Sequence, residues 1–328
     1  MAAGVKRAWP WFVALAVAGA FVVSATTSRF QGSTLIVNAS IVDGTGSPAR
    51  KGAVRIVDGR IAEVGDLTPR HGDGIVDARG LVLAPGFIDT HSHHAGGLFD
   101  ALDAPAVVSQ GITTIVVGQD GSSDVPLQKF FGRLTSAPAS VNVASYVGHG
   151  TLRSQVMGDD FKRKATPEEV SKMADLLRSE MRSGALGLSS GLEYDPGIYS
   201  DPSEVVALAR VAADLGGRYM SHVRSEDREF WKAIDEAITI GHEARIPVQV
   251  SHLKLAMRSL WGQTDRLLKT LDAARASGVD VTADIYPYTY WQSGMTVLFP
   301  NRDFENREAA EFALREVTSA EGLIVTRY

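Results

Sequence analysis

The sequence of 328 residues contains no cysteine. This absence excludes disulfide bridges, iron–sulfur clusters and zinc sites built from thiolates. Neither sign of charge is in strong excess, since the net charge is −5 and the isoelectric point lies near 5.9, so the balance gives no reason to expect a nucleic-acid partner. No glycine-rich phosphate loop follows a strand-like segment, and nothing therefore indicates a nucleotide cofactor.

The N-terminus has a pattern typical of an export signal. Two basic residues, Lys6 and Arg7, precede an uncharged apolar stretch, and residues 23–25 have the small-x-small form of a cleavage site. A proline and a glycine inside the stretch make it marginal for spanning ~30 Å of hydrocarbon. The sequence predicts an export signal over residues 1–25 and a mature protein in the periplasm or outside the cell. Retained instead of cleaved, the same segment would be a membrane anchor.

The full sequence has an ordinary globular composition, with 45% hydrophobic and 22% charged residues, and its length suffices for one large domain and a smaller one. Residues 26–84 are predicted to form the smaller domain, a small β-domain. The Asp58-Gly59 pair separates two alternating apolar runs, which is a strong hairpin signal. We expect strands over residues 34–37, 53–57, 61–64 and 81–83.

From residue 85 onward the pattern becomes strand, loop and helix, repeated about every thirty residues. Thr166 and Asp201 each stand before a proline and precede a glutamate by three residues, as at helix starts. This alternation predicts an α/β fold of the (β/α)8 barrel type over residues 85–328, with its chemistry at the carboxyl ends of the strands. Only seven barrel strands are expected, over residues 86–89, 113–117, 141–147, 186–189, 218–221, 248–251 and 279–283, so we expect a barrel that is incomplete at the C-terminus.

Four histidines stand where these predicted strands end. His91 and His93 are two residues apart and would face the same side of an extended chain. His222 and His252 each end a later apolar run, thirty residues apart. Because the carboxyl ends of parallel strands meet at one rim, this pattern indicates a metal site.

Several ordered motifs resemble the amidohydrolase superfamily and, within it, the N-acyl-D-amino-acid deacylase (D-aminoacylase) branch. The superfamily likeness is carried by residues 51–65 and 84–93. The likeness to the deacylases is carried by residues 111–121, 146–153, 187–194 and 221–226. Together it covers residues 34–295 and implies a metal-dependent hydrolase barrel with a small N-terminal β-domain.

The resemblance implies the metal ligands. His91 and His93 would end the first barrel strand, and His222 and His252 the fifth and sixth. A cysteine usually binds the metal after the second strand in this family, whereas this chain has Asp120 there. Aspartate is a harder donor that also binds zinc and can bridge two ions. We expect one zinc held tightly by Asp120, His222 and His252, and a weaker second position at His91, His93 and Asp120.

The resemblance also implies contacts to a substrate carboxylate. The matching positions are Tyr194, Lys254 and Tyr286, all of which can donate hydrogen bonds. Zinc with an open coordination position would lower the pKa of bound water towards ~7 and polarise an amide carbonyl. The family's proton carrier is an aspartate that ends the eighth strand; no residue of this sequence matches it, so the catalytic residue is unassigned. Asp284 ends the seventh strand and is expected to be structural.

The resulting prediction is zinc-dependent hydrolysis of N-acyl-D-amino acids, at a rate that the incomplete barrel would reduce. The partner is a small-molecule substrate, and the oligomeric state is not predicted. The alternatives are a related amidohydrolase acting on cyclic amides or acylated dipeptides, and a shortened chain that binds metal without turnover. Single residues also have other interpretations: Asp120 as a turn former, His149 as either a core residue or one that lines the site, and Glu193 as either an orienting group or a reserve ligand.

Overall fold

The computed structural model describes residues 32–326. The chain divides into two compact units, residues 1–85 and residues 86–328, called here the β-unit and the barrel unit. The predicted export signal lies outside the described residues. Over residues 32–326 no helix combines the length and the apolar character needed to cross a membrane.

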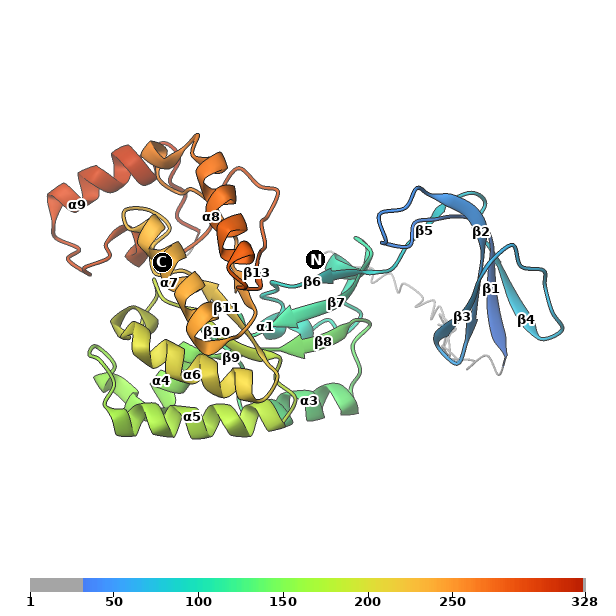
Figure 1. Ribbon diagram of the computed structural model, residues 1–328, viewed down its shortest axis with the longest axis horizontal. Helices are drawn as coiled ribbons and strands as arrows, with labels where there is room; N and C mark the ends of the chain where they lie inside the picture. Colours follow the sequence, from blue (N-terminus) through green and yellow to red (C-terminus); the bar gives the residue numbers. More distant parts are fainter. Residues whose placement is uncertain (1–31, 327–328) are drawn as a thin grey trace, which may run out of the picture. The chain divides into compact units, whose positions relative to one another are not determined.

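The β-unit is one five-stranded sheet (Figure 1). Strands β3, β2, β1 and β4 lie in that order, and β5 also pairs with β1. All four predicted strands are present. β4 was not predicted, because it has only two apolar residues between aspartates and a glycine. The bounds are β1 Ser33–Ile41, β2 Arg50–Val57, β3 Arg60–Gly65, β4 Asp73–Asp77 and β5 Val82–Leu83.

The predicted hairpin joins β2 to β3. Val57 pairs with Arg60, which leaves a two-residue turn. Asp58 has φ 49° and Gly59 has φ 73°. A turn with two positive φ angles matches the right-handed twist of the strands it joins, and aspartate followed by glycine adopts it readily.

The barrel unit alternates strands and helices as predicted. Its strands are β6 Phe87–Asp89, β7 Ile112–Val117, β8 Asn142–Ser145, β9 Val147–Gly148, β10 Gly187–Gly191, β11 Arg218–His222, β12 Val248–Val250 and β13 Val281–Ala283. Its α-helices are α1 Ala95–Leu98, α2 Pro105–Val108, α3 Leu127–Ser136, α4 His149–Met157, α5 Pro167–Arg182, α6 Pro202–Asp214, α7 Phe230–Ala244, α8 Thr264–Ala276 and α9 Arg307–Phe312. Short 3₁₀ turns span Gly158–Asp160, Gly197–Tyr199, Arg258–Leu260 and Met295–Leu298, and a π turn spans Ala313–Val317.

All strand pairs of the barrel unit are parallel. One sheet has the order β6-β7-β8 and the other β13-β12-β11-β10-β9. The predicted third strand, residues 141–147, is interrupted at Tyr146, so β8 and β9 are two parts of one strand that belongs to both sheets. Counting them together gives the seven predicted strands, and within residues 86–326 no ladder joins β6 to β13. The predicted α/β architecture with an open barrel is confirmed.

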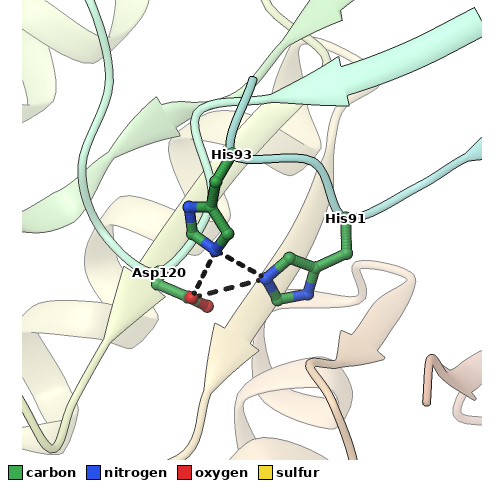
Figure 2. A group of neighbouring side chains, drawn as sticks. All are labelled: His91, His93 and Asp120. Atoms are coloured by element: carbon green, nitrogen blue, oxygen red, sulfur yellow. Dashed lines mark hydrogen bonds and ion pairs between the residues drawn. The ribbon is translucent and has the colours of Figure 1, made fainter. Parts of the chain in front are cut away.

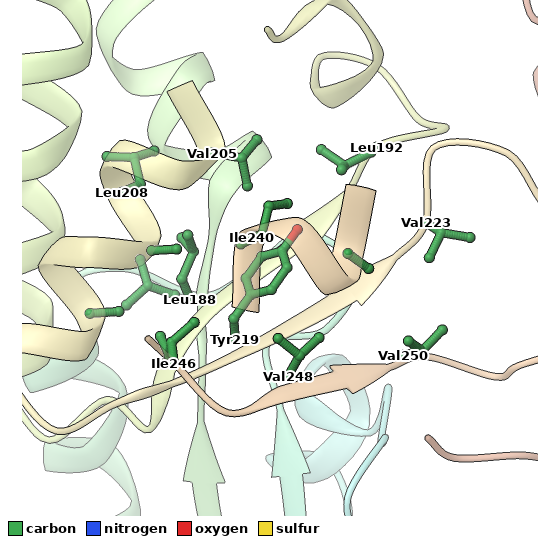
Figure 3. Close-up of a cluster of buried hydrophobic side chains, with 14 of the residues drawn as sticks. Leu188, Leu192, Val205, Leu208, Tyr219, Val223, Ile240, Ile246, Val248 and Val250 are labelled. Carbon is green, nitrogen blue, oxygen red and sulfur yellow. The ribbon is translucent and has the colours of Figure 1, made fainter. Parts of the chain in front are cut away.

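Helices cover the outer face of the larger sheet. Helices α5, α6 and α7 lie side by side, with α6 against β10 and β11 and α7 against β12 (Figure 1). The core between them is apolar (Figure 3): Leu188, Tyr219 and Val248 come from three adjacent strands, and Leu208 and Ile240 from the covering helices. Burying such side chains contributes about 1.5–3 kcal/mol each and holds the strand ends in register.

The two predicted helix starts differ in detail. At α5 the Thr166 hydroxyl accepts from the Glu169 amide and the Glu169 carboxylate accepts from the Thr166 amide, which is the predicted capping box. At α6 the Asp201 side chain caps the amide of Ser203 instead. Glu204 turns inward, is 3% exposed, and accepts hydrogen bonds from buried residues of α4.

Candidate metal centre

The five predicted ligands gather at the carboxyl ends of the parallel strands. His91 and His93 follow β6, Asp120 follows β7, His222 ends β11 and His252 follows β12. They form two groups that share Asp120, and within each group the potential ligand atoms lie within 4.8 Å of one another. The structure therefore brings together all five residues that the sequence selected.

The first group is His91, His93 and Asp120, and Figure 2 shows the two imidazoles and the carboxylate pointing toward one another. The Nε2 atoms of the two histidines are 3.3 Å apart. Asp120 Oδ2 lies 3.3 Å from Nε2 of His91 and 3.2 Å from Nε2 of His93. The His93 side chain is 68% exposed, whereas those of His91 and Asp120 are 10% and 12% exposed.

The second group is Asp120, His222 and His252. Nδ1 of His222 and Nε2 of His252 face each other at 2.8 Å. Nε2 of His252 is 3.7 Å from Oδ1 of Asp120. This group is buried more deeply than the first, with the side chains of His222 and His252 only 3% and 13% exposed.

The donor set of these groups fits a divalent cation. Imidazole nitrogen and carboxylate oxygen are donors that zinc accepts. Oδ1 of Asp120 is buried and has no hydrogen-bond partner among the described residues, although a buried carboxylate oxygen is costly to leave unpaired. A cation held by Asp120, His222 and His252 would satisfy that oxygen.

The charges of the centre are strongly coupled. Burial opposes ionisation of Asp120, but the neighbouring imidazoles of His252, His91 and His93 outweigh burial and hold the pKa of the carboxyl far below its ordinary value. Burial likewise opposes protonation of His91. Its hydrogen bonds to Asp120 and Asp284 are stronger in effect and raise the pKa of His91 to about 9. The centre thus stabilises positive charge next to Asp120.

Two predicted ligands have unusual backbone conformations. Asp120 has φ 52° and His252 has φ 34°, in a region that residues with a side chain adopt rarely and that is enriched at functional sites. Next to Asp120, Gly121 has φ 79°, and a Cβ placed there would lie 2.7 Å from the amide nitrogen of Gly191. The glycine lets the loop that carries Asp120 lie directly against β10.

Three histidines of the centre bind a second carboxylate through their other ring nitrogen. Nδ1 of His91 is 3.1 Å from Oδ1 of Asp284. Nε2 of His222 is 3.0 Å from Oε2 of Glu193, and Nδ1 of His252 is 2.9 Å from Oε1 of Glu226. We call these acids the outer carboxylates: Glu193, Glu226 and Asp284.

Sequence reasoning found the outer carboxylates only in part. The sequence indicates an orienting or reserve-ligand role for Glu193 and a structural role for Asp284. It predicts no role for Glu226, which lies in the same motif as His222. Asp284 does hold the rim, because it accepts from the His252 amide at 2.7 Å and from Gln249 Nε2 at 2.7 Å.

The pKa values of two outer carboxylates, Glu193 and Glu226, are shifted in opposite directions. Burial raises the pKa of Glu193, and its bond to His222 only partly opposes this. Burial acts in the same sense on Glu226, but His252, His222 and Lys254 outweigh it and lower the pKa of Glu226 to about 2. Glu226 is therefore the more firmly charged of the two.

The three predicted substrate contacts line one pocket beside the centre, together with His222 and His252. The Tyr194 ring lies 4.2 Å from that of His222, centroid to centroid. Burial raises the pKa of Tyr194, and burial raises that of Tyr286 to about 12, so both phenols keep their protons. Lys254 donates to Glu226 and to the His252 carbonyl oxygen at 3.1 Å. Its charge is thus shared with an acid that the sequence did not identify.

Two other polar residues of the barrel unit bind groups outside this pocket. Arg224 forms a two-pronged ion pair with Glu236, with both distances 2.8 Å. His149 is fully buried, and its Nε2 is 2.7 Å from Oε1 of Glu204. The second interaction favours the structural interpretation of His149.

The model of the amidohydrolase family matches residues 74–318, which is most of the chain. The chain belongs to the amidohydrolase family. It is 35% identical to a D-aminoacylase of Alcaligenes xylosoxydans xylosoxydans over 291 residues, 82% of this chain and 59% of that protein. An N-acyl-D-glutamate deacylase of the same organism is 36% identical over 284 residues, 80% of this chain and 57% of that protein.

Among solved structures, the chain resembles an N-acyl-D-glutamate deacylase from Bordetella bronchiseptica. That structure holds zinc and a phosphonate inhibitor, a mimic of the reaction tetrahedral intermediate. The TM-score is 0.74 and the identity 36%, over 78% of this chain and 58% of that one. The chain thus spans less than three-fifths of the length of each of these amidohydrolases.

Proposed function

We propose that the protein hydrolyses the amide bond of N-acyl-D-amino acids with the help of bound zinc. The observation that carries this proposal is the cluster of four histidines and Asp120 beside a pocket that contains Lys254, Tyr194 and Tyr286. Relatives at 35–36% identity that are named for D-aminoacylase and N-acyl-D-glutamate deacylase activity support it.

The metal would supply Lewis-acid chemistry, polarising the amide carbonyl and acidifying a water molecule. Asp120, His222 and His252 would hold the principal ion. His91 and His93 would add a second, weaker position. The more buried group is assigned the tighter site because its low local dielectric strengthens the attraction between carboxylate and cation.

The pocket would orient the substrate through its amino-acid carboxylate. The phenols of Tyr194 and Tyr286 remain protonated and can donate hydrogen bonds to an anion. The Lys254 ammonium has three donors, so it can keep its bond to Glu226 while binding a carboxylate. The proton carrier stays unassigned, because Asp120 and the outer carboxylates already contact imidazoles.

The test combines metal content with stereospecific turnover. The purified chain is loaded with zinc and supplied with N-acetyl-D- and N-acetyl-L-amino acids, while a D-amino-acid oxidase assay detects the product. We expect zinc to be retained and D-amino acid to be released, with His222→Ala as the matched control. Substrate binding is measured separately by calorimetry and should favour the D-isomer.

Other outcomes of this test would contradict the proposal. Equal binding of D- and L-isomers would remove the proposed substrate class. Turnover of cyclic amides or acylated dipeptides alone would favour the alternative amidohydrolase. Zinc binding without any turnover would fit a chain that binds metal but does not catalyse.

The proposal extends to location and domain limits. On the pattern of residues 1–25, we propose export followed by cleavage after Ala25. The mature protein would then comprise the β-domain over residues 26–84 and the hydrolase domain from residue 85. N-terminal sequencing of protein recovered outside the cytoplasm tests this, and an intact N-terminus in the membrane fraction would indicate an anchor instead.

A further inference from the structure

We propose that three carboxylates outside the cluster fix the tautomers of its histidines and so determine which ring nitrogen each histidine offers to the metal. These are the outer carboxylates Glu193, Glu226 and Asp284. The inference rests on the proposed function only in assuming that the centre holds a metal. It assigns these acids as positioning residues and not as ligands.

The argument is clearest at His222. A neutral imidazole has one N–H and one nitrogen with a free lone pair, and only the latter can bind a metal. An ionised carboxylate can only accept a hydrogen bond, so Glu193 at 3.0 Å from Nε2 places the proton on that nitrogen. Nδ1 then carries the lone pair, and this is the atom that faces His252 at 2.8 Å.

At His252 two neighbours compete for the same nitrogen. Glu226 Oε1 lies 2.9 Å from Nδ1 and would accept its proton. Lys254 Nζ lies 3.1 Å from Nδ1 and would donate to it, which requires the opposite tautomer. Lys254 already donates to Glu226 and to the His252 carbonyl oxygen. An ionised carboxylate can only accept, whereas Lys254 has these other acceptors, so the inferred tautomer follows Glu226 and leaves Nε2 free toward Asp120.

His91 shows the same arrangement with a different acid. Its Nδ1 lies 3.1 Å from Asp284 Oδ1, while its Nε2 lies 3.3 Å from Asp120 Oδ2. Bonds from the His252 amide and from Gln249 hold Asp284 in place. The carboxylate that receives the outer proton is thus itself fixed by the neighbouring strand.

His93 provides a comparison inside the same centre. Among residues 32–326 its ring bonds Asp120 but no outer carboxylate, and its side chain is 68% exposed. Both tautomers and several ring orientations are open to it. We therefore expect His93 to contribute least to metal affinity, whereas each buried histidine is held by its own acid.

One observation allows a different role for two of these acids. The ligand atoms of Glu193, His222 and Glu226 also lie within 4.8 Å of one another, which is compatible with a separate cation site. A cation bound there through Nε2 of His222 would need the lone pair of that nitrogen, whereas the tautomer proposed above places the lone pair on Nδ1. Metal stoichiometry distinguishes the two roles.

The first experiment measures zinc affinity by competition with a chromogenic chelator. Glu193→Gln and Glu226→Gln keep an acceptor oxygen but lose the charge, while the alanine variants lose both. We expect zinc dissociation constants to rise about 10–100-fold in the alanine variants, with glutamine intermediate and stoichiometry unchanged. The matched control is Glu204→Gln, because Glu204 is another buried glutamate that binds a histidine, His149, outside the cluster.

The second experiment observes the tautomers directly by ¹⁵N NMR of the imidazoles in the zinc-loaded protein. His222 should carry its proton on Nε2 and His252 on Nδ1, and Glu226→Ala should broaden or shift the His252 signals. A merely structural role for the glutamates would change stability but leave these signals in place.

Several results would overturn the inference. Unchanged zinc affinity in the glutamate variants, or a fall equal to that of Glu204→Gln, would contradict it while the proposed function stands. Loss of one zinc equivalent from Glu193→Gln would show a third cation site instead. A proton on Nε2 of His252 would assign the tautomer to Lys254. A parent protein that binds no zinc would contradict both the inference and the proposed function.

Discussion

At the scale of single residues, Asp120 is the side chain on which the candidate centre depends. It lies within hydrogen-bonding distance of His91 and His93, contacts His252 at 3.7 Å, and belongs to both groups of potential ligands. Its two oxygens point to different groups, since Oδ2 meets the first pair and Oδ1 faces His252. A carboxylate in this position can bridge two cations.

The ligand histidines should contribute unequally to zinc binding. We expect His222→Ala or His252→Ala to remove most of the bound zinc, because both rings are buried and each is held by an outer carboxylate. His93→Ala should remove less, because its ring is exposed. Elemental analysis of the purified variants decides this, and equal loss from all three would contradict the asymmetric centre.

Replacement of Asp120 should distinguish a role as a metal ligand from a role as a turn former only. Asp120→Ala should weaken both metal positions, because it removes the shared donor. Asp120→Cys should tighten zinc, because thiolate is the softer donor and restores the family's usual ligand. Chelator competition measures both variants. If the alanine variant binds zinc as tightly as the parent, Asp120 only shapes its loop.

At the scale of elements, a buried ion network joins α4 to α6. Arg153 is fully buried and makes two hydrogen bonds to Glu204, at 2.7 and 2.6 Å, and His149 adds a third at 2.7 Å. Burial opposes ionisation of Glu204, but His149 and Arg153 outweigh it and lower its pKa. This network positions α4, which begins directly after β9.

Breaking the network should destabilise the barrel unit. Glu204→Ala leaves Arg153 buried without a counter-ion, which typically costs about 3–5 kcal/mol. Glu204→Gln should cost less, because its amide oxygen still accepts. Since folding lowers the pKa of Glu204, its charge stabilises the fold above the unfolded value of ~4.3, and this contribution is lost as the pH falls through the folded pKa. Urea unfolding at pH 7 and pH 3 should show a smaller difference between parent and Glu204→Gln at pH 3.

The sequence could predict those secondary-structure elements that depend on local patterns. The alternation of strands and helices, the Asp58-Gly59 turn and the Thr166 cap depend on local patterns, and all three are confirmed. The sequence does not predict β4, because this strand forms by pairing with the distant strand β1 and its own residues have no strand pattern. Glu204 resembled a capping residue, but a buried arginine on another helix binds it.

The candidate centre also contains residues that local patterns could predict and others that depend on long-range contacts. The histidines and Asp120 stand at strand ends, where parallel topology alone brings them together, so spacing and family resemblance could identify them. Glu226 and the bond between His91 and Asp284 depend on how loops fold over the rim. The contact between Glu226 and His252 joins residues 26 positions apart, and that between His91 and Asp284 joins residues 193 positions apart. No local sequence pattern could therefore predict them.

At the scale of the whole barrel unit, the candidate centre joins strands that no ladder connects in the described chain. His91 follows β6 at one edge of the open sheet, and Asp284 follows β13 at the other. Their hydrogen bond, and that from Gln249 to Thr90 at 3.0 Å, draw the two edges together at the rim that carries the metal ligands.

Metal binding should therefore stabilise the entire barrel unit. A ligand that binds only the folded state at 100 times its dissociation constant contributes about 2.7 kcal/mol, which for a domain of this size corresponds to a rise in melting temperature of roughly 5–10 °C. Residues 32–85 contain no tryptophan whereas Trp231, Trp261 and Trp291 lie in the barrel unit, so tryptophan fluorescence follows the relevant transition. His222→Ala should lose most of the zinc-dependent rise and His93→Ala should keep most of it. A melting temperature that is the same with and without zinc in the parent would show that the metal, if bound, does not link the strands.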